Sequence, residues 1–209
     1  MAITAQQIID DVRQPLSDTG TRWTDAELLA ALNTTIAEIA DARPDASIVT
    51  TDLALAAGTK QSLPAGAAAL VDVTRNTSGR AVRKTSVALL DAQRPTWHTD
   101  TAAVTKNYTY DPRTPRIFYV YPPAVAAASV EVKYRAAPTV LTAVDNAIPI
   151  DDTYRQLMVD GVLWRAYAKD AEYASSGTLA GIHKAAYEAG LGRKTAADTA
   201  AAPREAAEA

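Results

Sequence analysis

Two stripes of apolar residues at helical spacing open the chain. The first follows Thr4 and ends before Pro15, and the second follows Thr24 and ends before Pro44. Thr is suited to capping a helix, and the residue before a proline is pushed out of helical geometry. The spacing therefore predicts two helices joined by a turn near residues 17–20. The stripe residues are Ile8, Ile9 and Val12 in the first helix and Leu28, Leu29, Leu32, Ile36 and Ile39 in the second.

The second of these helices has well-defined sequence signals at its start. Glu27 stands three residues after Thr24 and completes a capping box, and Trp23 and Leu28 occupy the two positions of a hydrophobic staple. The first helix has the same kind of pair in Thr4 and Gln7. The second helix contains no His, Cys or buried acid pair. These features indicate a structural scaffold rather than a catalytic centre.

From about Thr50 the apolar period changes from helical to alternating, which predicts strands. The clearest strand is 129–135, where Val130, Val132 and Tyr134 share one face and Glu131, Lys133 and Arg135 share the other. The other predicted elements are a strand around Leu53 and Leu55 returning at 60–63 after a turn at Gly58, a strand at 70–75, a brief helical turn at 87–93, and a hairpin of 104–110 with 117–121.

After residue 150 the helical period returns. Asp151 or Asp152 can cap a helix that runs to about Tyr173, and Thr178 can cap a second one from Leu179 to about Ala189. Gly190 and Gly192 are expected to end the second helix. Apolar residues go most of the way round the helix at 151–173, so it is expected either in the middle of a bundle or at a subunit interface. Its candidate interface residues are Leu157, Leu163, Trp164 and Tyr167.

Helices at both ends and strands between them predict an α+β fold rather than an α/β fold. The expected parts are N-terminal helices at 1–48, a β-rich lobe at 49–148, C-terminal helices at 149–192 and a flexible tail at 193–209. The two sets of helices are expected to pack together as one bundle. The tail lacks large apolar residues that could offset the loss of chain entropy, so we expect it to be disordered or extended in the free protein and to order against a partner.

Composition narrows the functional classes. The net charge is −3, from 21 basic and 24 acidic residues, so charge alone does not predict tight nonspecific nucleic-acid binding. The absence of cysteine excludes disulfides and Cys-based zinc sites. The sequence contains no run of about 18 apolar residues, so it predicts no membrane-spanning helix. The first residues lack a secretory pattern, so synthesis in the cytosol is expected.

The sequence offers little catalytic chemistry. His98 and His183 are the only histidines, and we interpret them as a loop residue and a helix-surface residue. The acid pairs 10–11 and 151–152 could suggest a Mg²⁺ site, but we interpret them as structural, and 151–152 lies at a helix start, where acids cap free N–H groups and offset the helix dipole. Sequence motifs for phosphate-binding loops, dinucleotide sites, esterases and zincins are absent. We therefore expect no enzyme activity, no cofactor and no metal.

Tyrosines are concentrated in the predicted hairpin and the strand after it. Tyr108, Tyr119 and Tyr121 are the candidate interface residues of this region. Tyrosines can stack on sugars or bases, and they can equally pack across strands or line a protein interface. The surrounding sequence is not basic, which favours packing or a protein interface.

Several segments taken in order resemble the head-to-tail adaptor, or connector, proteins of tailed bacteriophages, and specifically the tail tubular protein A type. The likeness spans about residues 1–190. The segments are WTDAELLAALN with its ARPDA end, LALAAGTKQSLPAGAAALVDVTRN, the loop at Trp97, DPRTPRIFYVYPP, VEVKYRAAP and DNAIPIDDTYRQLMVDGVLWRAYAKDAEY.

The resemblance implies a virion structural protein at the portal–tail junction. It implies a ring, commonly of twelve subunits, that joins the portal protein to the tail nozzle or next tail component. DNA would pass through the channel without sequence-specific binding. We further expect a mainly monomeric free subunit, a ring that forms on the portal, and burial of Leu157, Leu163 and Trp164 in the assembly. Two alternatives remain: a head-completion or tail-terminator protein of a long-tailed phage, and a β-rich carbohydrate-binding module.

Overall fold

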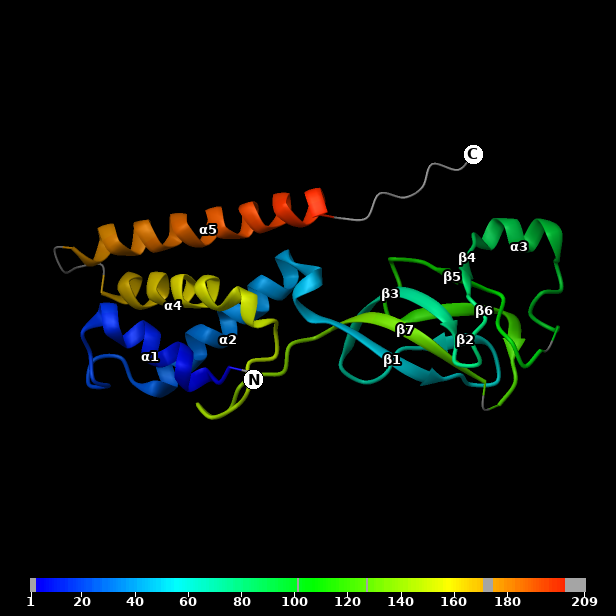
Figure 1. Ribbon diagram of the computed structural model, residues 1–209, viewed down its shortest axis with the longest axis horizontal. Coiled ribbons are helices and arrows are strands. Elements are labelled where there is room, and N and C mark those ends of the chain that lie inside the picture. The colour runs from blue at the N-terminus through cyan, green and yellow to red at the C-terminus, as the bar shows by residue number, and fades with distance from the viewer. Residues whose placement is uncertain (1–2, 101, 127, 171–174, 202–209) are drawn as a thin grey trace. The chain divides into compact units, whose positions relative to one another are not determined.

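The computed structural model describes residues 3–100, 102–126, 128–170 and 175–201. Its fold is mixed α+β, as the sequence predicted (Figure 1). The chain divides into two compact units. The helical unit comprises the described parts of residues 1–46 and 138–209, and the β unit comprises those of residues 47–137. The helical unit therefore draws on both ends of the chain, and the β unit is one continuous segment.

The N-terminal helices are α1 (Ala5–Leu16) and α2 (Asp25–Ala42), and both predicted capping boxes form. Thr24 Oγ1 accepts a hydrogen bond from the Glu27 N–H at 3.3 Å, and a Glu27 carboxylate oxygen accepts one from the Thr24 N–H at 3.1 Å. Helix α1 continues through Pro15, because a proline in the last turn removes a single hydrogen bond without stopping the helix at once. The 3₁₀ helix η1 (Pro44–Ser47) follows α2.

The C-terminal helices differ from the prediction at their ends. Asp151 caps the 3₁₀ helix η2 (Asp152–Tyr154), which leads into α4 (Arg155–Lys169). Helix α4 ends at Lys169, short of the predicted end at Tyr173, which lies outside the described residues together with 171, 172 and 174. Helix α5 (Ser176–Ala201) begins before Thr178.

The prediction that Gly190 and Gly192 end the last helix is wrong, because α5 runs through both. A Cβ atom at Gly190 would lie 2.7 Å from Leu157 Cδ1, so the glycine there permits α5 to approach α4 closely. The continuation also makes residues 193–201 helical, although they belong to the predicted tail. The rest of that tail, residues 202–209, lies outside the described residues, and its flexibility stays a prediction.

Four helices share one apolar core in the helical unit. Helix α4 contacts α1, α2 and α5, and it lies between α5 and the N-terminal pair (Figure 1). Leu141, Ile148 and Ile150 from the segment after the β unit join this core, although residues up to 148 were assigned to the β-rich lobe from the sequence. The fully buried members include Ile8, Ile9, Leu28, Leu32, Ile36, Ile39, Tyr154, Met158 and Leu163.

Two sheets make up the β unit. The first has the order β1 (Ile48–Ala54), β7 (Ser129–Ala136) and β3 (Ala67–Asn76). The second has the order β2 (Gly58–Ser62), β6 (Ile117–Ala124), β5 (Asn107–Tyr110) and β4 (Arg83–Lys84). Helix α3 (Val87–Gln93) confirms the predicted helical turn. All pairings are antiparallel except that of β4 with β5.

The predicted strands exist, but one predicted return is wrong. Strands β5 and β6 pair as the expected hairpin, with Tyr108 opposite Val120. Strand β2 does not return along β1: β1 pairs with β7 and β2 pairs with β6, so the turn at Gly58 leads from one sheet to the other. The core holds the predicted inward residues Val130 and Val132, both fully buried.

Candidate interaction surfaces

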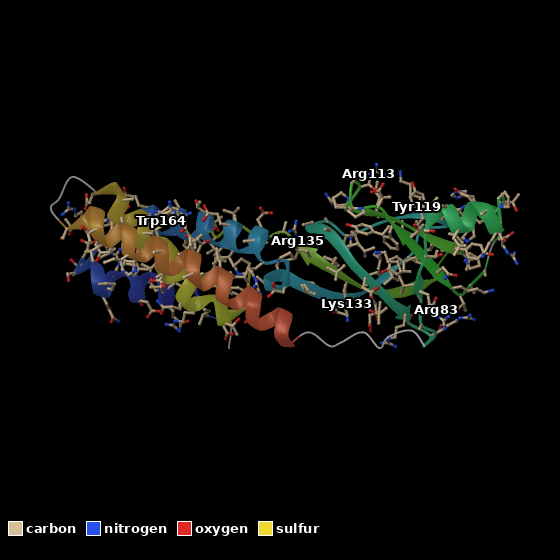
Figure 2. The ribbon with its side chains drawn as sticks, turned by 90° about the horizontal axis from the view of Figure 1, so that it is seen from above. Arg83, Arg113, Tyr119, Lys133, Arg135 and Trp164 are labelled. Atoms are coloured by element: carbon tan, nitrogen blue, oxygen red, sulfur yellow. The ribbon has the colours of Figure 1, made fainter. Side chains whose placement is uncertain are left out.

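The indole of Trp164 forms the centre of a half-buried surface on α4 and α5. The guanidinium carbon of Arg165 lies 4.4 Å from the centroid of the indole ring, and Lys184 Nζ lies 5.4 Å from it. The ring of Tyr187 lies 6.2 Å away, centroid to centroid. This surface therefore combines a flat apolar ring with two cations, a combination typical of protein interfaces. Figure 2 shows Trp164 among the helices.

Polar contacts fix this surface to helix α2. Arg165 donates to Glu38 at 2.6 Å and to Thr35 Oγ1 at 3.1 Å, and the Tyr187 hydroxyl donates to Glu38 at 3.3 Å. Burial, together with the nearby Glu38 carboxylate, raises the pKa of Tyr187 to about 12. At neutral pH the tyrosine is therefore a neutral donor. The geometry around Trp164 is set before any partner arrives.

The other candidate residues of α4 differ in exposure. Leu157 is half-buried against the apolar core, whereas Leu163 and Tyr167 are buried. The Tyr167 hydroxyl donates to the Pro15 carbonyl at 2.9 Å, and its ring stacks on His183 with centroids 5.8 Å apart. Leu163 and Tyr167 thus serve the subunit's own core. Leu157 and Trp164 are the two candidates of α4 that keep an accessible surface.

His183 has a partner that its interpretation as a surface residue did not include. Its Nδ1 lies 2.9 Å from an oxygen of Asp160, whose side chain is almost buried. Gln156 donates to the other oxygen of the same carboxylate at 3.1 Å. The contact joins α5 to α4 from positions 23 residues apart in sequence, and spacing along a single helix cannot reveal it.

The three candidate tyrosines of the β unit play different roles. Tyr108 is buried, and its hydroxyl donates to Asp72 at 2.8 Å, so burial and then the carboxylate raise its pKa above the usual value. Tyr119 and Tyr121 are half-buried and meet the ring of Trp97 edge-on, with centroids 6.4 Å apart in each case. Trp97 is itself buried. Of the three, Tyr108 belongs to the core, whereas Tyr119 and Tyr121 retain surface for a partner.

The loop histidine is engaged in the same packing. His98 stacks on Trp97 with centroids 3.7 Å apart, and its Nδ1 lies 2.9 Å from Thr59 Oγ1. The indole N–H of Trp97 donates to Asp91 at 2.8 Å. The aromatic side chains of Trp97, His98, Tyr119 and Tyr121 therefore pack against one another.

The acid pairs have structural partners. Asp10 accepts a hydrogen bond from Gln6 at 2.8 Å, and Asp11 accepts one from Arg155 at the same distance. Asp151 caps η2 through the Thr153 N–H at 2.9 Å. Across the part of the chain that the structure describes, no group of three or more His, Cys, Asp or Glu side chains is placed to hold a metal ion. In the same residues, no helix has the length and apolarity needed to cross a bilayer.

Charge is divided unequally between the two units. The β-unit segment carries eleven basic and six acidic residues, a net charge of +5. The rest of the chain carries ten basic and eighteen acidic residues, a net charge of −8. The net charge of −3 for the whole chain is the sum of these two opposite charges, so it does not indicate how charge is divided between the units. Arg80, Arg83 and Lys106 line a surface cavity of about 380 Å³ in the β unit.

Comparison with known protein families identifies the kind of protein to which this chain is related. Residues 3–207 match the SU10 adaptor protein family. The chain belongs to the SU10 adaptor protein family. The prediction of a bacteriophage head-to-tail adaptor is thereby confirmed, and this is a family of phage structural proteins rather than of enzymes. The finer assignment to the tail tubular protein A type stays a prediction. None of the curated proteins compared with this SU10 adaptor matches it.

Proposed function

We propose that this SU10 adaptor forms a ring that joins the portal of the capsid to the tail and encloses a channel for DNA. The family match over residues 3–207 is the observation that carries the proposal. We further propose twelve subunits, a tail nozzle or similar component as the distal partner, and a position at the portal–tail junction of the virion. DNA passes through the channel without sequence-specific binding.

The accessible surfaces support lateral or portal contacts. A closed ring needs two different patches on each subunit, because its contacts are head-to-tail. Trp164 and Leu157 keep accessible surface in the helical unit, and Tyr119 and Tyr121 keep it in the β unit. Aromatic residues are enriched at protein interfaces and supply much of their binding energy. We propose these four residues as interface residues.

Assembly on a purified portal protein tests the proposal. The adaptor alone at micromolar concentration should sediment mainly as a monomer, and the portal mixture should contain a complex with a whole ring of adaptors. Failure to bind the portal, or a tight two-fold dimer in both settings, would reject the ring. A closed ring that forms without the portal protein would contradict only the prediction that the ring forms on the portal.

A variant at Trp164 then tests the interface. Trp164→Ala should weaken portal assembly at least tenfold, because a buried interfacial Trp commonly contributes about 2 kcal/mol or more. Ile182→Ala is the matched control, since Ile182 is an apolar residue of α5 with 56% of its surface exposed. Equal losses in the two variants would remove Trp164 from the interface.

A further inference from the structure

A tight hairpin brings three cations of the β unit together. Strand β3 ends at Asn76, and the chain reverses through Gly79, whose φ is +109°. The Asn76 N–H donates to the Arg80 carbonyl at 2.7 Å, which closes the turn. The Arg83 N–H donates to the Lys106 carbonyl at 3.0 Å, and β4 then pairs with β5. The backbones that carry Arg80, Arg83 and Lys106 are therefore neighbours.

The buried side chain of Asn76 holds these segments in place. Its Nδ2 donates to the carbonyls of Arg80 and Thr105 at 2.9 and 2.8 Å, and its Oδ1 accepts from the Thr105 N–H at 2.9 Å. Only 3% of Asn76 is exposed, so these bonds form away from competing water. The spacing between the hairpin and the segment before β5 is thus fixed without any ligand.

The three cations are left without opposing charges. Their side chains are exposed, and within the described ranges no ion pair joins Arg80, Arg83 or Lys106 to a carboxylate. The cavity of about 380 Å³ is lined by these residues with Ala81 and Asn107, and none of its described lining residues is acidic. Three like charges held near one another create a positive potential that an anion relieves.

We propose that Arg80, Arg83 and Lys106 form a binding site for the phosphate backbone of duplex DNA. A guanidinium group can bind a phosphate through two parallel hydrogen bonds, and the Lys ammonium adds a point charge. The net charge of +5 on this unit favours approach of a polyanion. Arg83 lies on β4, the edge strand of its sheet, and its side chain is exposed (Figure 2).

The composition of the site favours nucleic acid over an acidic protein. Protein interfaces have an apolar, largely uncharged centre, whereas protein–DNA interfaces are polar and strongly positive. Apart from the aliphatic parts of the three cations, Ala81 is the apolar residue that lines this cavity. The proposal goes beyond the ring function, and it stands even if portal binding fails, because the free subunit already contains the complete site.

Binding of a fluorescent 30-base-pair duplex to the full-length protein tests the site. Fluorescence anisotropy between 50 and 200 mM salt should show a loss of affinity of about 40-fold, the value for three phosphate contacts. Arg83→Ala should reduce this loss to about 12-fold, because two contacts remain. Lys60→Ala is the matched control: Lys60 is an exposed cation of the same unit, on β2 outside the cavity, and its removal should leave the salt dependence unchanged.

Three results would overturn the proposal. The first is an equal effect of Arg83→Ala and Lys60→Ala on the salt dependence, which would mean general charge attraction. The second is that poly-glutamate at the same charge concentration competes as well as DNA does, which would mean an acidic protein ligand. The third is that the duplex does not bind at 50 mM salt. Thermal unfolding of both variants serves as the folding check. Arg83 and Lys60 are exposed, so unchanged melting temperatures are expected.

Discussion

The two units of this adaptor are built in opposite ways. The helical unit is assembled from helices that lie at the two ends of the sequence, and α4 links them by contacting α1, α2 and α5. The β unit is a single segment between them, with its own apolar core. The helical unit therefore needs segments from both sides of the β unit, whereas the long-range pairs of the β unit, such as β1 with β7, all lie within one segment. We therefore expect that a mutation in one unit can destabilise that unit without destabilising the other.

The units also differ in charge and in the use of their aromatic residues. The helical segments carry −8 and the β-unit segment carries +5. Trp164 lies at a surface with two cations beside it, whereas Trp97 is buried beneath Tyr119 and Tyr121. The two units therefore offer a partner different charges and different aromatic surfaces, as expected of an adaptor that binds two different partners.

The strongest test of the comparison is one core deletion in each unit. Leu163→Ala should lower the unfolding free energy of the helical unit by about 2–5 kcal/mol, and Phe118→Ala should lower that of the β unit by about 3–5 kcal/mol. Both side chains are almost fully buried in separate cores. Trp97 is the one tryptophan of the β-unit segment, so its fluorescence in a Trp23→Phe, Trp164→Phe background reports that unit. A single transition that shifts in both variants would show that the units unfold together.

A smaller effect is expected where α4 packs closely against its neighbours. At Gly161 a Cβ atom would lie 2.5 Å from Thr35 Cγ2 and 3.2 Å from Tyr187 Cε2, so Gly161→Ala should destabilise the helical unit by about 1–3 kcal/mol. Gly181→Ala on α5 meets nothing within 4 Å and should stabilise it by up to about 1 kcal/mol. Chemical denaturation followed by far-ultraviolet circular dichroism measures both. Effects of the same sign would contradict close packing at Gly161.

The smallest expected effect concerns acid. In Asp18, burial opposes ionisation but is outweighed by hydrogen bonds from the backbone N–H groups of residues 20–23, which lower the pKa to about 2. A lowered pKa stabilises the fold above the unfolded value of 3.8, and this contribution is lost as pH falls toward 2.

The pKa values of Glu27 and Asp45 are also lowered, so the melting temperature of the helical unit should fall from pH 5 to pH 2. Asp18→Asn should make that fall smaller and leave the melting temperature of the β unit unchanged. A titration of both transitions over this range provides the measurement. An equal or steeper fall in the variant would contradict the role given to Asp18.

Local signals in the sequence predicted local structure well. Thr4 with Gln7 and Thr24 with Glu27 formed their capping boxes, because each pair needs only its own turn of helix. The alternation around Val130 and Val132 correctly predicted that these residues share one face of β7, because side chains alternate along any strand whatever its partners are.

Contacts between distant elements were beyond the sequence patterns. Gly190 looked like a helix end, but its role is to admit Leu157 from another helix. The turn at Gly58 indicated a return of the chain, but the partner of each strand is decided by β6 and β7, far along the sequence. The site at Arg83 was missed because the total charge of −3 averages two segments of opposite sign.

The insertion of the β unit between α2 and α4 has a consequence for synthesis on the ribosome. Helices α1 and α2 leave the exit tunnel before α4, and the apolar faces that they turn toward α4 have no partner until the chain has been translated through Lys169, the end of α4. At elongation rates of roughly 5–20 residues per second, translation from the end of α2 to the end of α4 takes roughly 6–25 s. During that interval the nascent chain exposes Leu28, Leu32 and Ile36, and transiently exposed apolar surface of this kind is prone to aggregation.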